Sequence, residues 1–273
     1  TLEVSIPATI LIRTLRHGLD PCKASWAEGR DLFRFGAKSA GIMAANSLVR
    51  QGLLFVISHS LGAASITFYV LCGRLVEYGA QLITAVGFPI TPYQTQALGQ
   101  AGVTGARASF EYTTRAMQFI QAGVAMGILW LGLPFLAHWM GPDYAHKGAP
   151  VFYCLVGSLS FCVLGANSSR MLVTLNRHGK AAIGGAVLGV LAFLLGLVLV
   201  PRLGLVGAAL SAAAFSVSQN TLELVLVTRA LGLSFRDHAG RTARRLALPV
   251  LTGSCALAGL AVVYPAQGYL RIG

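Results

Sequence analysis

Apolar runs of roughly 20 residues recur along this chain, and they limit the possible folds more than any other feature. A helix of about that length crosses the ~30 Å hydrocarbon layer of a membrane. With 55% hydrophobic and 11% charged residues, the chain is also too apolar for an ordinary globular domain. We therefore expect an integral membrane protein, with spans over 32–58, 64–90, 116–140, 150–175, 181–200, 205–228 and 246–264.

The expected fold is an all-α, polytopic transmembrane helical bundle. Barrel strands are excluded because their alternate residues would face a polar lumen, whereas these runs are uniformly apolar. Helices also satisfy every backbone amide within the segment itself. We expect residues 1–31 to form the end of a preceding helix and a basic linker, 32–232 a six-helix lobe, and 233–273 a basic link and an additional helix. The chain is expected to be a piece of a longer protein.

The basic residues predict the orientation of the bundle. If the spans alternate, most of the 21 lysines and arginines lie on one side, and the other side holds only Lys147, Arg202 and Arg271. The positive-inside rule then places the N-terminal end of the chain in the cytoplasm. The net charge of +12 is spread over short loops without an aromatic platform, so we expect no nucleic-acid partner.

The second run, FYVLCGRLVEYGAQLIT, contains charged residues in otherwise apolar surroundings. Arg74, Glu77 and Gln81 are three and four positions apart, so a helix presents them on one face. In the first run, Asn46 and Arg50 share a face for the same reason. A charge in the bilayer centre costs about 2.5 kcal/mol or more, so such residues usually face a bundle interior or a wet cavity. We expect these five residues to line a substrate-binding lumen.

The same charges have two interpretations. Arg74 and Glu77 would form an ion pair that only joins helices, or they would share a lumen with Arg50, where two cations against one carboxylate favour an anionic ligand such as a diphosphate. Polar faces on the third and sixth runs extend the lumen hypothesis. They consist of Thr114, Gln118 and Gln121, and of Ser216, Gln219 or Asn220, and Glu223.

Glu223 has its own alternatives. It is a candidate coupling residue for a proton or a cation, an interfacial residue, or a partner for Arg229. No catalytic motif and no metal-ligand spacing is present, so we expect neither an enzyme nor a cofactor or metal site.

Four stretches resemble a known family when taken in order. They are LFRFGAKSAGIMAANSLVRQGLLFVISHSLGAAS, TFYVLCGRLVEYGAQLITAVGFPITPYQTQAL, LPFLAHWMGPDYAHKGAPVFYCLVGS and LVPRLGLVGAALSAAAFSV. This order resembles the second lobe of Wzx-type polysaccharide and O-antigen flippases, in the multidrug/oligosaccharidyl-lipid/polysaccharide exporter superfamily. The resemblance covers roughly 28–235.

The resemblance implies two six-helix lobes that enclose a central cationic cavity and carry polyprenyl-diphosphate-linked sugars outward by alternating access. Arg50 and Arg74 stand in places similar to arginines of relatives that flip the peptidoglycan precursor. The chain departs from the family pattern because it lacks a first lobe, so alone it would hold half a cavity.

The function that the resemblance implies is translocation of a lipid-linked oligosaccharide for cell-surface polysaccharide biosynthesis, in the bacterial inner membrane. The expected partners are the lipid-linked oligosaccharide, membrane lipids, a polysaccharide polymerase and glycosyltransferases. Two alternatives stay open. A cation-coupled multidrug antiporter of the same superfamily would be expected to carry lumenal carboxylates, and a non-transporting scaffold of an export complex would tolerate loss of both arginines.

Overall fold

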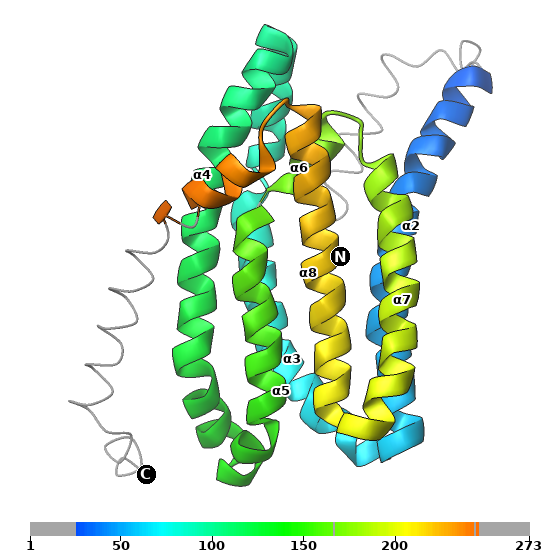
Figure 1. The fold of residues 1–273 in the computed structure, drawn as a ribbon, viewed down its shortest axis with the longest axis vertical. Coiled ribbons are helices and arrows are strands. Elements are labelled where there is room, and N and C mark those ends of the chain that lie inside the picture. The colour runs from blue at the N-terminus through cyan, green and yellow to red at the C-terminus, as the bar shows by residue number, and fades with distance from the viewer. Residues whose placement is uncertain (1–25, 166, 243, 246–273) are drawn as a thin grey trace, which may run out of the picture.

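The computed structural model describes residues 26–245 apart from 166 and 243, and every regular element among them is a helix (Figure 1). The predicted all-α bundle is thus confirmed. The expected preceding helix and linker within 1–25, and the span over 246–264, lie outside the described residues. The elements are α2 (Trp26–Leu61), α3 (Ala63–Gly87), α4 (Ile90–Met140), α5 (Pro142–Phe161), the 3₁₀ turn η2 (Cys162–Gly165), α6 (Ser168–Thr174), α7 (Gly179–Leu203) and α8 (Leu205–Ala230).

Three helical stretches of the described chain are long and apolar enough to cross a membrane. They are Ala63–Met140, which contains α3 and α4, and the single helices α7 and α8. The chain is therefore a transmembrane protein. Helices α2 and α5 run alongside these stretches in one bundle (Figure 1), and α2 begins at Trp26, before the expected start at residue 32.

Single glycines join the helices at one end of the bundle, which is the lower end in Figure 1. Gly62 connects α2 to α3, Gly141 connects α4 to α5, and Gly204 connects α7 to α8. Their φ angles are 84°, 96° and 62°, a region that only glycine enters without a steric penalty. A one-residue link leaves no room for other geometries, so each pair of helices is antiparallel.

The expected single helix over 150–175 is wrong. Helix α5 ends at Phe161, η2 follows, and α6 starts only at Ser168. Asn167 occupies the break with a φ of 74°, a conformation that asparagine tolerates better than most residues. Its side-chain Nδ2 donates a hydrogen bond of 2.8 Å to Thr113 Oγ1. A polar side chain thus holds the chain where the helical ladder is interrupted.

The expected link over 91–115 is helical, and it reverses direction on itself. Ala101 and Gly102 leave helical geometry, so α4 consists of two arms that meet at the upper end of Figure 1. Gln94 Nε2 on the first arm donates a 2.9 Å hydrogen bond to Thr113 Oγ1 on the second. The Thr113 hydroxyl therefore accepts one hydrogen bond from Gln94, near the reversal of α4, and one from Asn167, at the α5–α6 break.

Small residues bring α2 and α7 close together, as membrane helices require in the absence of a hydrophobic drive between them. A Cβ atom at Gly52 of α2 would meet the ring of Phe193, and one at Gly196 of α7 would meet the Leu53 side chain. The contact buries Val49 and Leu53 on one side of α2. Arg50, next to Val49, lies on the surface that faces α3 instead.

The Thr113 hydroxyl accepts hydrogen bonds from both Gln94 and Asn167, and replacing it tests whether it stabilises these two parts of the bundle. Thr113→Val removes the acceptor of the buried Gln94 amide and leaves the Asn167 amide only its 3.5 Å contact with Thr114 Oγ1, so we expect the free energy of unfolding to fall by about 2 kcal/mol. The control is Thr95→Val, an exposed position whose hydroxyl bonds only to Thr91 O in its own helix, and it should change stability by less than about 0.5 kcal/mol. Denaturant titration in detergent micelles measures both; equal losses would contradict the role of Thr113.

Candidate functional site

A cavity of about 590 Å³ lies between α2, α3, α5 and α8, with η2 at one edge. Apolar residues such as Leu54, Val70 and Leu159 form much of its wall. A ligand pocket of this kind typically combines an apolar wall with a few convergent polar groups. The polar lining residues are Arg50, Gln51, Tyr69, Arg74, Glu77, Ser158, Cys162 and Ser216.

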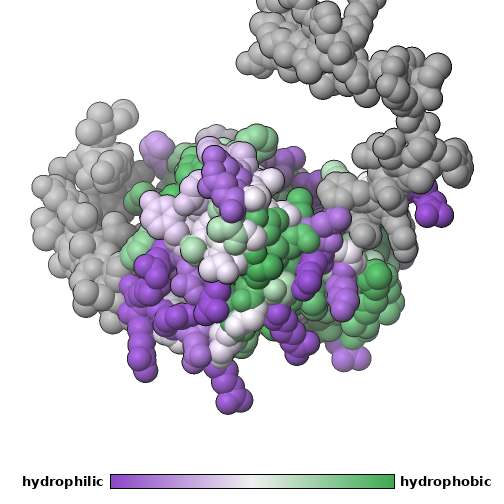
Figure 2. All heavy atoms as spheres, turned by 90° about the horizontal axis from the view of Figure 1, so that it is seen from above, coloured by the Kyte–Doolittle hydropathy of each residue, from purple (hydrophilic) through white to green (hydrophobic). Residues whose placement is uncertain are grey.

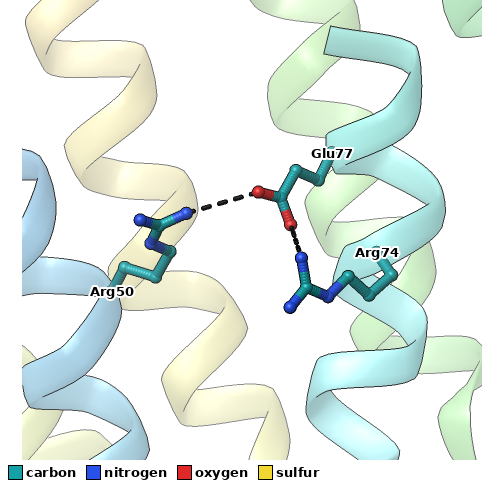
Figure 3. Close-up of polar contacts among 3 residues, drawn as sticks. All are labelled: Arg50, Arg74 and Glu77. Atoms are coloured by element: carbon teal, nitrogen blue, oxygen red, sulfur yellow. Dashed lines mark hydrogen bonds and ion pairs between the residues drawn. The ribbon is translucent and has the colours of Figure 1, made fainter. Parts of the chain in front are cut away.

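Arg50, Arg74 and Glu77 form one ion-paired group inside this cavity (Figure 3). Arg50 reaches from α2 and places Nη1 3.3 Å from Glu77 Oε1, while Arg74, one turn away on α3, places Nη1 3.0 Å from Glu77 Oε2. Each carboxylate oxygen thus contacts one guanidinium. The structure confirms neither interpretation alone, because the expected pair within α3 and the expected proximity of Arg50 are both present.

The local sequence explains why α3 carries this group. Positions three and four apart share a face, so Arg74 and Glu77 project together toward the cavity. The opposite side of α3 packs into the bundle through Cys72, Gly79 and Ile83, all of which are buried. The helix therefore has one packed face and one cavity face.

The exposure of the three side chains separates this group from a buried structural ion pair. The side chains of Arg50 and Arg74 retain 64% and 54% of their accessible surface, and Glu77 retains 31%. Ion pairs this exposed usually contribute about 0.2–1 kcal/mol to stability. Glu77 engages one nitrogen of each guanidinium, so further N–H donors of both arginines are available to a ligand.

The charges of the cavity do not cancel. Within the described chain, its lining contains no charged residue besides these two arginines and one glutamate. The lining therefore has one uncompensated positive charge. An anion that can accept several N–H bonds at once suits such a site better than a cation does.

Two of the five predicted lumen residues lie outside the cavity lining. Asn46 is exposed on α2 one turn before Arg50, and Gln81 is exposed on α3 one turn after Glu77. Their helical spacing puts them on the same faces as the charged residues, but at the level where the cavity has ended. The structure thus brings together three of the five.

The polar face of the third run lies elsewhere, so the expectation that it joins this lumen is wrong. Gln118 Nε2 donates to Thr242 Oγ1 at 2.9 Å, which attaches the helical segment 235–242 to α4. Gln121 Nε2 donates to the Leu159 carbonyl at 3.2 Å. These buried amides fasten α4 to its neighbours. Helical periodicity identifies a polar face, but such a face can border either a cavity or polar groups of neighbouring helices.

Glu223 lies within α8. Its side chain is buried, and Oε1 accepts a 2.8 Å hydrogen bond from Gln219 Nε2 on the preceding turn. Ser216, two turns before Glu223 on the same face, lines the cavity, whereas Glu223 itself does not. Among the described residues no ion pair joins Glu223 to Arg229, the partner that the sequence also suggested.

Sequence reasoning missed several polar residues of the cavity. Tyr69 precedes Glu77 by eight residues, which places both on one face of α3, so helical periodicity could have found it. Ser158 and Cys162 also stand four apart, but they belong to the 150–175 run, in which hydropathy gives no sign of the break after Phe161. Only the packing of α5 against α3 shows which side of that helix faces the cavity.

Comparison with known proteins finds no matching family model, no matching curated protein and no matching solved structure. In the described part of the chain, no three histidine, cysteine, aspartate or glutamate side chains come together as metal ligands would.

Water access to the cavity can be tested by cysteine labelling. In a variant without the native cysteines, we expect Ser158→Cys to react with a membrane-impermeant methanethiosulfonate because its side chain lines the cavity. Ser211→Cys is the control, since Ser211 is completely buried in α8, and it should stay unlabelled. Mass spectrometry of the labelled protein gives the result. Equal labelling of both positions, or of neither, would contradict a water-filled cavity.

Proposed function

We propose that this chain forms one lobe of a flippase that moves polyprenyl-diphosphate-linked oligosaccharide across the membrane for cell-surface polysaccharide biosynthesis. The observation that carries the proposal is the pair of exposed, cavity-facing arginines held by a single glutamate. The resemblance of four ordered stretches to the second lobe of Wzx-type flippases supports the same assignment.

The charge of the substrate is opposite to the net charge of the cavity lining. A diphosphate offers several oxygen acceptors, and planar guanidinium groups bind such oxygens with paired N–H bonds. When the diphosphate enters, it competes with the Glu77 carboxylate for Arg50 and Arg74. The arginines thus exchange a carboxylate that compensates only one of their two charges for a diphosphate that can compensate both.

The remaining parts of the substrate have matching surroundings. Tyr69, Ser158 and Ser216 supply hydroxyl groups to the sugars within the cavity. The polyprenyl chain stays in the lipid, because its transfer into a wet cavity would expose apolar surface to water. Asn46 and Gln81 continue the polar faces beyond the cavity and would contact a larger oligosaccharide.

This proposal makes the protein a transporter, not an enzyme. We place it in the bacterial inner membrane with its basic end, and hence the N-terminal end of this chain, in the cytoplasm. The partners are the lipid-linked oligosaccharide, membrane lipids, and the polymerase and glycosyltransferases of the same biosynthesis. A first lobe would complete the cavity, and the two lobes would open it to each side of the membrane in turn.

A cation-coupled multidrug antiporter is the second candidate, and buried Glu223 is the observation that favours it. A carboxyl group within a transmembrane helix is costly unless it has a function or a partner. Gln219 provides one hydrogen bond, which leaves room for a proton or cation at the second oxygen. The same residue is a coupling candidate for a flippase, so it does not decide between the two.

Loss of either arginine tests the flippase proposal. In vesicles that contain the full-length protein, we expect Arg74→Ala and Arg50→Ala to slow outward flipping of a polyprenyl-diphosphate oligosaccharide about tenfold or more, because each removes charged hydrogen bonds to the diphosphate. The control is Arg202→Ala, which changes an exposed arginine in the last turn of α7 and should retain wild-type flipping.

The variants are compared at equal amounts of folded protein. Undiminished flipping by both cavity variants would make the arginines structural, as in the scaffold alternative. If the wild type exports cationic drugs and does not flip the oligosaccharide, the antiporter replaces the flippase.

Neutralising Glu223 tests coupling. Glu223→Gln keeps the side-chain size and the possibility of a hydrogen bond to Gln219, but it can neither bind a proton as a carboxylate nor compensate a cation. We expect flipping to lose its response to an imposed proton or sodium gradient while substrate binding persists. Glu111→Gln, at the basic end of the bundle, is the control. An unchanged gradient response would assign Glu223 a structural role.

A further inference from the structure

A second pocket, of about 420 Å³, lies between the link from α6 to α7 and the last turn of α8. Three cationic side chains line it, namely Arg177, Lys180 and Arg229, and all three are exposed. Its lining contains no acidic residue, and within the described chain none of the three forms an ion pair. The pocket shares no lining residue with the cavity of Arg50 and Arg74.

The wall formed by the end of α6 has a fixed backbone. Asn176 adopts a left-handed conformation with a φ of 51°, and its N–H bonds to the Val173 carbonyl at 2.9 Å. The next N–H, that of Arg177, bonds back to the Leu172 carbonyl at 2.9 Å. This pair of bonds is the Schellman motif, which closes a helix with a defined geometry. It sets the position from which the Arg177 side chain extends.

The wall formed by the end of α8 is closed in the same way. Gly232 has a φ of 64°, its N–H bonds to the Arg229 carbonyl at 3.3 Å, and the Leu233 N–H bonds to the Thr228 carbonyl at 2.8 Å. Arg229 thus belongs to a second capped helix end. Two capped helices hold cations around one pocket, so like charges face each other without a compensating anion. Such an arrangement favours the binding of an anion.

The surroundings of the pocket are apolar. Leu172 and Leu226 form its floor. On α7, Ile183, Val187 and Leu191 follow Lys180 on the same helical face, and all three are exposed in the bundle. An exposed apolar face on a transmembrane helix is suited to contact with hydrocarbon. A ligand that bridges both environments therefore combines an anionic group with an aliphatic chain.

We propose that this pocket binds the phosphate headgroup of an anionic phospholipid, whose acyl chain lies along the exposed face of α7. The three cations hold the phosphate, and Ile183 and Val187 contact the chain. Figure 2 looks onto this end of the bundle and shows hydrophilic residues gathered around its rim, next to apolar surface. The site is independent of the flippase proposal, because it uses a separate pocket at one end of the bundle.

The experiment measures which lipid remains bound to the purified protein. The full chain is reconstituted in phosphatidylcholine vesicles with a minor fraction of phosphatidylglycerol, extracted in mild detergent, and analysed by native mass spectrometry. We expect the wild type to retain phosphatidylglycerol preferentially, and the triple variant Arg177→Gln, Lys180→Gln, Arg229→Gln to retain it at least about tenfold less.

A matched control removes the same charge elsewhere at the same end of the bundle. Arg236→Gln, Arg244→Gln, Arg245→Gln changes three exposed arginines outside the pocket and should retain phosphatidylglycerol within about twofold of the wild type. If the triple variant does not fold, the single variant Lys180→Gln replaces it in the test. This variant should reduce phosphatidylglycerol retention several-fold without changing phosphatidylcholine binding.

Three results would overturn the proposal. Equal loss in the control variant would show that surface charge alone attracts the lipid. Unchanged retention in the pocket variants would place the lipid elsewhere. Binding of inorganic phosphate by the wild type without preferential retention of phosphatidylglycerol would show that the pocket recognises a free phosphate and not a lipid.

Discussion

Every peptide group within the hydrocarbon layer must be hydrogen-bonded inside the protein, and the rest of this structure depends on that requirement. It makes each span a helix, and it makes any interruption costly unless a side chain replaces the lost bonds. At the break between α5 and α6, the Asn167 side-chain amide donates a hydrogen bond to the Thr113 hydroxyl, and this bond between side chains attaches the break to α4. Gln94 bonds to the same hydroxyl, so one buried contact holds both irregular parts of the bundle.

Charged groups obey a related requirement, because an ion in the membrane needs a partner or water. The cavity between α2, α3, α5 and α8 provides both. Glu77 contacts two arginines, and all three side chains keep access to the cavity. Two arginines around one glutamate would be a poor structural link between helices, because the second arginine adds electrostatic repulsion with the first. In the proposed flippase, the carboxylate would hold the guanidinium groups in place until the diphosphate arrives.

The two ends of the bundle differ in a way that suits different tasks. One end consists of helices joined through Gly62, Gly141 and Gly204, which leave little surface for binding. The other end contains the reversal of α4, the α6–α7 link and the segment after α8, together with most of the exposed cations of the described chain. Schellman caps at Asn176 and Gly232 fix the backbone there. These caps hold the backbone on two sides of the pocket that we propose for an anionic lipid.

The sequence by itself determined the all-α membrane fold and the shared faces of Arg74 and Glu77 and of Asn46 and Arg50, because hydropathy and helical periodicity are local properties. Only the tertiary structure decided that Arg50 meets Glu77, that Gln118 and Gln121 bond to neighbouring segments and leave the cavity, and that the 150–175 run breaks at Asn167. A polar face specifies that a helix needs a partner there; which partner satisfies it depends on the packing of helices distant in sequence.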